Sequence, residues 1–189
     1  MRLLLTPNDI AQLQYDVAYK RDERAYKQLF IFFYPQLFRF ASQIINNVEA
    51  SEEIVLDVMM RIWEMESRLG EVSSLKVYLF KAIKNSSLTY LSSKKISLIE
   101  LDEINSKETS SYNPDQNLLD LELKEYINNA VQSLPHKCKW VYRLIKEEGF
   151  TYKEASAVLN VSINTIENHM AIAFKKISQH LHRYLKENE

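Results

Sequence analysis

The stretch FTYKEASAVLNVSINTIENHMAIAFKKI, residues 150–177, decides how the C-terminal part of the chain folds. Thr151 followed three residues later by Glu154 is a capping box, which starts a helix by satisfying its first free amides. Asn160 tolerates the left-handed backbone of a tight turn, and Ser162 is a good N-cap for a second helix. The stretch is therefore predicted to form two helices joined by a tight turn, a helix-turn-helix.

Each helix of this motif has an apolar face. In the second helix the apolar residues follow each other at steps of three or four, which makes one continuous stripe. The residues expected to point inward are Ala155, Val158 and Leu159 from the first helix, and Ile163, Ile166, Met170, Phe174, Ile177 and Leu181 from the second.

The opposite face of the second helix is polar and suits the major groove of DNA. Asparagine can pair with adenine through two hydrogen bonds, and threonine can meet a thymine methyl group or a phosphate. Lysines near the helix end suit phosphates, although they also complement the helix dipole. A helical hairpin with a solvated polar face is the alternative. The expected DNA-binding residues are Ser162, Asn164, Thr165, Asn168, His169, Lys175 and Lys176.

The composition indicates an all-helical protein. Of the 189 residues 46% are apolar, only two are Gly and four are Pro, and no alternating strand pattern is present. The single Cys138 fits a reducing cytoplasm, and with only His136 near it no metal site and no cofactor are expected. The most apolar window, residues 29–45, contains Pro35 and is shorter than a membrane span. We expect a cytoplasmic protein without membrane insertion.

The charge is distributed unevenly along the chain, whose net charge is -1. Residues 1–95 carry 13 Lys/Arg and 11 Asp/Glu, residues 96–123 carry one Lys and seven acids, and residues 124–189 carry ten Lys/Arg and seven acids. Phosphate neutralisation supplies most non-specific DNA affinity. The free chain is therefore expected to bind DNA weakly and to need a partner that contributes more cationic surface.

The apolar periodicities predict two small helical domains. Residues 1–21 are an N-terminal extension, residues 22–95 the first domain, and residues 121–185 a second domain that contains the helix-turn-helix. Between them, residues 96–120 include the polar, turn-rich run SKETSSYNPDQN and are predicted to be a flexible acidic linker.

Three helices are predicted in the first domain. The first follows Asp22 and contains a kink at Pro35, the second covers about residues 50–69 and stops at Gly70, and the third covers about residues 74–91. The second helix is expected to bury Ile54, Val58, Ile62 and Met65 and to expose Glu53, Asp57, Arg61 and Glu64. In the second domain, a helix to residue 132 and another over about residues 138–148 precede the helix-turn-helix.

The order of these pieces resembles the sigma-70 family of bacterial RNA polymerase sigma factors, in particular its short extracytoplasmic-function (ECF) group. The resemblance spans most of residues 22–185. It is carried by EASEEIVLDVMMRIWE at residues 49–64, YLFKAIKNSSLTYL at 78–91, SLPHKCKWVY at 133–142, and the helix-turn-helix. One such motif alone would be weak, whereas four in the right order and spacing are specific.

The resemblance implies a promoter-specificity subunit with no catalysis of its own. Its first domain, region 2, would dock on the clamp helices of the largest subunit of core RNA polymerase, and its second, region 4, would read the -35 element of promoter DNA. An anti-sigma factor is a common partner in the family. The docking residues would be Glu53, Asp57, Arg61 and Glu64, and the residues holding the -10 element would be Lys81, Lys84 and Asn85, with the preceding loop at 66–74.

Some of these assignments have a plain structural alternative. The charged face around Asp57 is also what an ordinary solvated helix presents, and Asn85 is equally well a helix-packing residue. The chain also departs from the family pattern at several positions. Thr89 and Ser92 stand where the family usually has an acidic residue and an arginine. Glu167 and His169 stand where many relatives have basic residues.

Three other functions compete with this interpretation. A stand-alone helix-turn-helix regulator would need a receiver or ligand-binding domain, whose strand–helix alternation is missing. An enzyme is disfavoured because the only glycines, Gly70 and Gly149, allow no phosphate-binding loop, and no nucleophile is paired with a base. Neither catalytic residues nor a small-molecule substrate are therefore expected. A purely protein-binding adaptor would bind polymerase without changing promoter choice.

Overall fold

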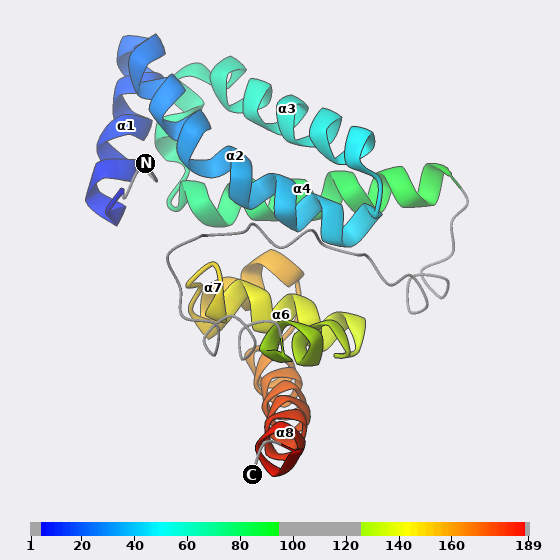
Figure 1. Cartoon of the computed structure of the whole chain (residues 1–189). Helices are drawn as coiled ribbons and strands as arrows, with labels where there is room; N and C mark the ends of the chain where they lie inside the picture. Colours follow the sequence, from blue (N-terminus) through cyan, green and yellow to red (C-terminus); the bar gives the residue numbers. More distant parts are fainter. Residues whose placement is uncertain (1–4, 95–125, 188–189) are drawn as a thin grey trace. The chain divides into compact units, whose positions relative to one another are not determined.

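The computed structural model of the protein describes residues 5–94 and 126–187 (Figure 1). Within these ranges the chain is helical and contains no strand, and it divides into two compact units. This confirms the predicted all-helical fold with a C-terminal helix-turn-helix. The expected linker at residues 96–120 lies outside the described residues.

The first unit holds four α-helices and a short 3-10 helix. They are α1 (Pro7–Lys20), α2 (Glu23–Ile45), α3 (Val48–Glu64), the 3-10 helix η1 (Glu66–Glu71) and α4 (Leu75–Ser93). The second unit holds a helical segment at residues 126–132, α6 (His136–Lys146), most of α7 (Tyr152–Leu159), and α8 (Ile163–Glu187). None of the described helices has both the length and the apolar character needed to cross a membrane.

Side-chain caps start the helices of the first unit. The Asp22 carboxylate accepts hydrogen bonds from the backbone amides of Arg24 and Ala25, as the sequence predicted for this cap. The side chains of Asn47 and Ser74 cap α3 and α4 in the same way. Each cap supplies an acceptor to amides that have no partner within the helix, so the three helix starts are fixed locally.

The core of the first unit forms around α2, which packs against α1, α3 and α4. Leu29, Phe33, Leu37 and Ile44 of α2 are completely buried. The helix continues through the exposed Pro35, which cannot donate a backbone hydrogen bond. Next to it, the Gln36 side-chain amide donates to the Phe32 carbonyl at 2.8 Å, so the turn around the proline keeps an additional hydrogen bond.

Helix α1 was not predicted, since residues 1–21 were expected to be only an extension. A signal for it is present in the sequence. The Thr6 hydroxyl accepts from the Asp9 amide at 3.2 Å, the Asp9 carboxylate accepts from the Thr6 amide at 2.8 Å, and Pro7 occupies the first helical position. A capping box followed by proline is a characteristic helix start.

The predicted end of the α3 helix at Gly70 was wrong. The helix ends at Glu64 with Met65 as its C-cap, and Glu66 then takes a left-handed conformation with φ of 51°. Gly70 lies inside η1 instead. The buried stripe of α3 also differs from the prediction, because Ile54 and Met65 are only half-buried. The buried apolar residues of the helix proper are Ala50, Val55, Val58, Met59 and Ile62.

The second unit is held by the apolar face of α8. Its core combines Ala130, Val131 and Leu134 with Cys138 of α6 and with Ala173 and Ile177 of α8. The predicted stripe of α8 is correct at Ile166, Met170 and Ile177, which are buried, but wrong at Ile163 and Phe174, which are exposed. Ala173 takes the inward place. The Phe174 ring lies on the surface, with its centroid 6.5 Å from that of Tyr142 and 5.2 Å from Lys146 Nζ.

The reversal between α6 and α7 depends on Gly149. This residue has φ of 68°, a conformation that costs glycine little. The reversal brings the Phe150 amide within 2.9 Å of the Leu144 carbonyl, and the Phe150 side chain is buried. The turn thereby places Thr151 at the start of α7.

Candidate nucleic-acid and protein interfaces

Hydrogen bonds between residues three positions apart fix the start of each helix of the helix-turn-helix. At α7, the Glu154 amide donates to the Thr151 hydroxyl at 3.2 Å, and the Thr151 amide donates to the Glu154 carboxylate at 2.8 Å. Asn160 ends α7 in a left-handed conformation with φ of 57°. At the start of α8, the Thr165 amide donates to the Ser162 hydroxyl at 3.1 Å. The predicted capping box, turn residue and N-cap are all present.

Four of the predicted DNA-contacting side chains of α8 are exposed. Asn164 and Asn168 lie one helical turn apart, and Lys175 and Lys176 follow about two turns later. Thr165 is half-buried, and its hydroxyl lies 2.8 Å from that of Ser162. The first turns of α8 therefore present two free amide side chains, and the lysines lie farther along the same helix.

His169 lies closer to the protein than its neighbours on α8. Its ring is half-buried, with Nδ1 3.4 Å from the Cys138 Sγ of α6. Burial lowers the pKa of His169, and the positive charge of Lys137 lowers it further. Burial also raises the pKa of the Cys138 thiol, against a smaller opposing effect of Lys176. The neutral imidazole is thus the favoured form at this contact between α6 and α8.

Helix α4 carries the three residues predicted to hold the -10 element. Lys81 and Asn85 are exposed and lie one turn apart. Lys84 is buried, on the same side of α4 as Ser87. The Thr89 hydroxyl donates to the backbone carbonyl of Asn85 at 3.0 Å, so this bond does not engage the Asn85 side chain. Lys81 and Asn85 therefore present accessible side chains.

The segment η1 precedes α4 and combines one buried anchor with a polar surface. Leu69 is completely buried. The exposed polar side chains of the segment are Glu66, Ser67, Arg68 and Glu71. The loop named in the sequence analysis is thus a short 3-10 helix held by one apolar side chain.

Helix α3 exposes all four residues predicted to bind polymerase. Glu53, Asp57, Arg61 and Glu64 follow each other at steps of three or four, so they share one side of the helix. The same side carries two large apolar residues that the sequence analysis did not single out. Leu56 is 44% exposed and Met60 is 54% exposed. We call these six residues the α3 face.

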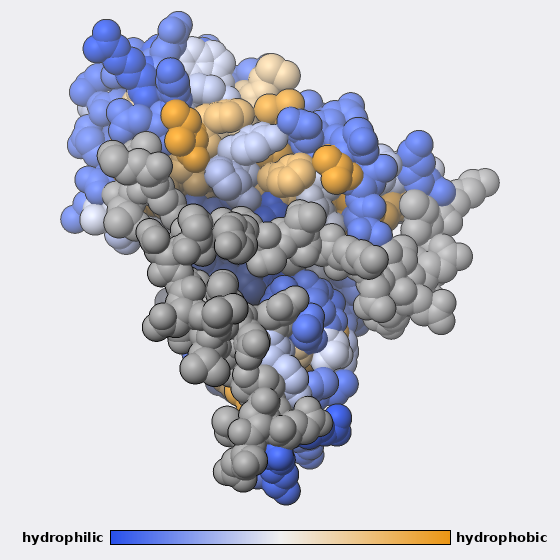
Figure 2. All heavy atoms as spheres, in the orientation of Figure 1, coloured by the Kyte–Doolittle hydropathy of each residue, from blue (hydrophilic) through white to orange (hydrophobic). Residues whose placement is uncertain are grey.

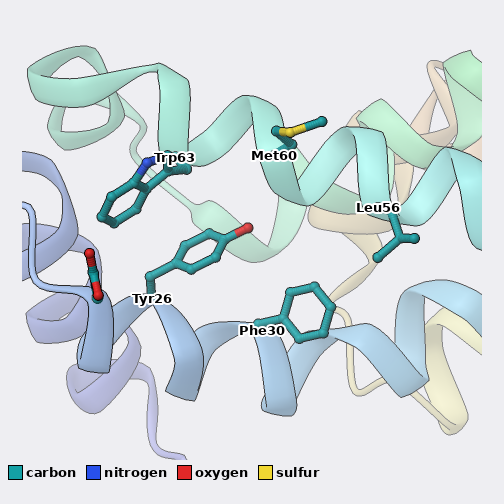
Figure 3. Close-up of a pocket in the computed structure, with 6 residues that line it drawn as sticks. Tyr26, Phe30, Leu56, Met60 and Trp63 are labelled. Atoms are coloured by element: carbon teal, nitrogen blue, oxygen red, sulfur yellow. The ribbon is translucent and has the colours of Figure 1, made fainter.

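The α3 face borders a pocket between α2 and α3 (Figure 3). Its volume is about 530 Å³, and it is lined by Glu23, Tyr26 and Phe30 of α2 and by Leu56, Met60 and Trp63 of α3. In the space-filling view, apolar side chains gather over these two helices (Figure 2). Large exposed apolar patches are characteristic of sites that bind another macromolecule.

One end of the pocket is built from aromatic rings (Figure 3). The Tyr26 ring lies 5.1 Å from the Trp63 ring, and its hydroxyl donates to the Met59 carbonyl at 3.0 Å. The Arg21 guanidinium lies 4.0 Å from the Trp63 ring centroid, a cation–π contact. Burial raises the pKa of Tyr26. These contacts fix the rings, so the pocket exists without a partner.

Sequence reasoning missed this pocket, although one signal for it was available. Leu56 and Met60 are apolar residues at the charged side of a helix whose buried residues all lie elsewhere. Within the described part of the chain, no three His, Cys, Asp or Glu side chains gather closely enough to hold a metal ion.

Comparison with known protein families identifies both units. The family model for sigma-70 region 2 matches residues 29–96, and that for sigma-70, region 4 matches residues 124–177. These ranges hold 68 and 54 residues, which is well over half of the chain's 189. The chain belongs to the sigma-70 family. The predicted family is confirmed, with the region 2 followed by region 4 that was expected for the ECF group.

In the terms of this family, region 2 contains most of α2 and all of α3, η1 and α4, and region 4 contains the helix-turn-helix. Helix α1 precedes the matched part of region 2. No curated protein sequence gives a significant match to the chain.

Two solved structures have a fold similar to that of this chain. One is the structure of CnrH in complex with the cytosolic domain of CnrY, with a TM-score of 0.60 and 19% identity, covering 93% of this chain and 98% of that one. The other is the sigma factor RpoE in complex with the anti-sigma factor NepR from Bartonella quintana. Its TM-score is 0.60 at 22% identity, covering 82% of this chain and 96% of that one.

The lowered pKa of His169 predicts a pH dependence of stability. The unfolded chain binds the proton more readily, at a pKa near 6.5. The stabilising contribution of the neutral ring is therefore complete above that pH and is lost as the pH falls through the lower folded-state pKa. Chemical denaturation at pH 7.5 and 5.5 should show a smaller loss of unfolding free energy for His169→Asn than for the unsubstituted chain.

The matched control is His182→Asn, since His182 is exposed on the same helix. This variant should keep the pH dependence of the unsubstituted chain. An unchanged pH dependence in His169→Asn would show that burial at this position does not disfavour the protonated ring.

Proposed function

We propose that the chain is an ECF-type sigma factor, which binds core RNA polymerase, directs it to specific promoters and helps to open the -10 element. The observation that carries the proposal is the presence of region 2 and region 4 of the sigma-70 family in one chain. The chain acts by binding and carries out no catalysis itself. Its place of action is the cytoplasm, where bacterial RNA polymerase works.

The α3 face and the adjoining pocket are the proposed docking surface for core polymerase. Glu53, Asp57 and Glu64 outnumber Arg61 on this face, so a basic partner surface is favoured. Leu56 and Met60 supply apolar area whose burial drives association, at about 25 cal/mol per Å². The pocket can receive one large apolar side chain of the partner as a central anchor. The position of Leu56 and Met60 at the rim of an apolar pocket favours a docking surface over a merely solvated helix face.

Helix α8 is proposed to read the -35 element from the major groove. Asn164 and Asn168 are exposed near the helix start, where a recognition helix contacts base edges. Lys175 and Lys176 would bind phosphates. Ser162, Thr165 and His169 contribute differently, because their side chains bond within the protein: the two hydroxyls to each other and the ring to Cys138. They would set the position of the two amides.

The -10 element is proposed to bind to α4 and η1. Unstacking a base costs a few kcal/mol, which contacts to the released strand must offset. Lys81 offers a charge for the backbone, and Asn85 offers two donors and an acceptor for a base. Lys84 belongs to the same proposed set. Because the whole chain has a net charge of -1, with only a small excess of Lys and Arg in residues 1–95 and 124–189, polymerase would supply much of the electrostatic attraction.

An anti-sigma factor is proposed as a further partner. Of the two similar structures, one shows RpoE in complex with the anti-sigma factor NepR, and the other shows CnrH in complex with the cytosolic domain of CnrY. A protein that covers the α3 face would compete directly with core polymerase.

Transcription with defined components tests the proposed function. The purified chain, mixed with bacterial core RNA polymerase that lacks any sigma factor, should start transcription at discrete sites on genomic DNA fragments. These sites should share sequences around positions -35 and -10. If the chain binds DNA alone but core polymerase stays unable to initiate, a stand-alone helix-turn-helix regulator is the better interpretation.

Asn168→Ala should weaken promoter discrimination without unfolding the protein, because the side chain is exposed. A lost bidentate contact to a base costs about 1–3 kcal/mol, or roughly 5- to 150-fold in affinity for the cognate -35 sequence. Competition between cognate and mutated -35 duplexes for the holoenzyme measures this ratio. Gln179→Ala, an exposed position nearer the end of α8, is the matched control and should keep full discrimination. Equal discrimination in both variants would refute the proposed reading face.

The double variant Leu56→Ser, Met60→Ser should bind core polymerase at least tenfold more weakly, because both apolar anchors of the α3 face are lost. Its thermal stability should change little, since both side chains are exposed. Val48→Ser, at a still more exposed apolar position on the same helix, is the control and should keep normal affinity. Titration of fluorescently labelled chain with core polymerase gives the affinities. A normal affinity of the double variant would exclude this face.

A further inference from the structure

Helix α1 has no assigned role, although it contacts the segment proposed to receive the -10 strand. It precedes the part of the chain that matches sigma-70 region 2. It packs against α2 and also against η1. Gln14 and Tyr19 of α1 both take part in the contact with η1.

The Gln14 side chain holds η1 through two backbone carbonyls. Its amide nitrogen donates to the Leu69 carbonyl at 2.7 Å and to the Val72 carbonyl at 2.8 Å. Leu69 is the buried anchor of η1, and Val72 is its C-cap. Gln14 is only 8% exposed, so water competes little for these bonds. One side chain thus uses both of its N–H donors to fix the last turn of η1.

The Tyr19 ring covers η1 at the position that has no side chain. A Cβ at Gly70 would overlap the end of this ring, so glycine is what allows the ring to lie against the segment. The Tyr15 ring supports Tyr19 with a centroid separation of 4.9 Å. Helix α1 therefore contacts η1 at Gly70 through Tyr19 and on both sides of Gly70 in the sequence, at Leu69 and Val72, through Gln14.

By itself η1 is weakly constrained. A 3-10 helix has poorer hydrogen-bond geometry than an α-helix and is rarely stable beyond four residues, whereas η1 has six. It begins at Glu66 in a left-handed conformation, which is unfavourable for a residue with a side chain. Only Leu69 of its six residues is buried. The contacts from α1 are thus a substantial part of what determines its shape.

We propose that Gln14 is a positioning residue for promoter opening: by fixing the carbonyls of Leu69 and Val72, it keeps η1 in the shape that receives the -10 strand. This inference rests on the proposed sigma function. A segment that is already ordered loses less conformational entropy when a strand binds. The apparent affinity is highest when the competent shape is fully populated. Helix α1 would then influence the -10 element without touching DNA.

The test uses the full chain with Gln14→Met, which keeps the length of the side chain and removes both donors. Gln12→Met is the matched control, because Gln12 is exposed on the same helix and donates to Asp16 within that helix, at 3.1 Å. Tyr19→Ala removes the second contact with η1. Each holoenzyme is titrated with a fluorescent single-stranded oligonucleotide that carries the non-template -10 sequence of a promoter mapped with the unsubstituted chain. The affinity for core polymerase and the hydrogen exchange of residues 66–72 are measured in parallel.

Gln14→Met should weaken binding of the -10 strand at least fivefold and speed amide exchange in residues 66–72. Its core polymerase affinity should stay within twofold of the unsubstituted chain. Tyr19→Ala should give a smaller effect of the same kind, and Gln12→Met should give none. Normal -10 strand binding by Gln14→Met would overturn the proposal. A parallel loss of strand binding and core affinity would also overturn it, because Gln14 would then merely stabilise the unit.

Failure of the sigma function itself would look different. In that case the unsubstituted chain would support no initiation and no -10 strand binding with core polymerase, and the proposal for Gln14 would fall with it. If the unsubstituted chain initiates normally, any result with Gln14→Met concerns the positioning role alone.

Discussion

The first unit depends on the burial of one face of α2. Helices α1, α3 and α4 all pack against this helix, and its buried residues include Leu29, Phe33 and Leu37. Removing a large buried side chain from such a core typically costs 2–5 kcal/mol, which is comparable with the whole stability of a small domain. The three helices that carry or support the proposed interfaces therefore owe their places to a single shared partner.

The half-buried side of α2 has a second use. Tyr26, Phe30, Tyr34 and Phe38 follow at four-residue steps, and the last three rings stack along the helix at 5.2 and 6.1 Å. The first two of these residues form one wall of the pocket. Aromatic side chains supply large contact area with few rotatable bonds, so a surface made of them loses little entropy on binding. The same helix thus holds the core together and supplies a rigid wall at the proposed docking surface.

The parts of the fold that could be predicted are those decided by neighbouring residues. The caps at Asp22 and Thr151 were correct because each depends on a side chain and a backbone amide within three residues. The turn at Asn160 was correct because it depends on the left-handed backbone of that one residue. Helix α1 carries an equally local signal in Thr6 and Asp9, which was overlooked. The sequence could not predict that Ala173 rather than Phe174 points into the core, because both residues fit the period of the apolar stripe. The position of α6 decides between them.

The candidate sites divide in the same way. Exposure of Asn164 and Asn168 follows from helix period alone, and it was predicted. The contact of His169 with Cys138 and the pocket between α2 and α3 require two helices to meet, so their geometry lies beyond any pattern within one segment. The hydrogen bonds from the Gln14 side chain to the carbonyls of Leu69 and Val72 join residues that are 55 and 58 positions apart in the sequence. Interactions of this length are set by the packed fold.

The burial of Cys138 has a practical consequence for spectroscopy. It is the only cysteine in the chain, and its thiol is both enclosed and held in the protonated form by a raised pKa. The thiolate is the species that reacts with maleimides and iodoacetamides, so the native residue reacts slowly at neutral pH. A cysteine introduced at an exposed position of either unit becomes the one fast-reacting thiol. Fluorophores or spin labels can thus be attached at chosen points while every native core residue is kept.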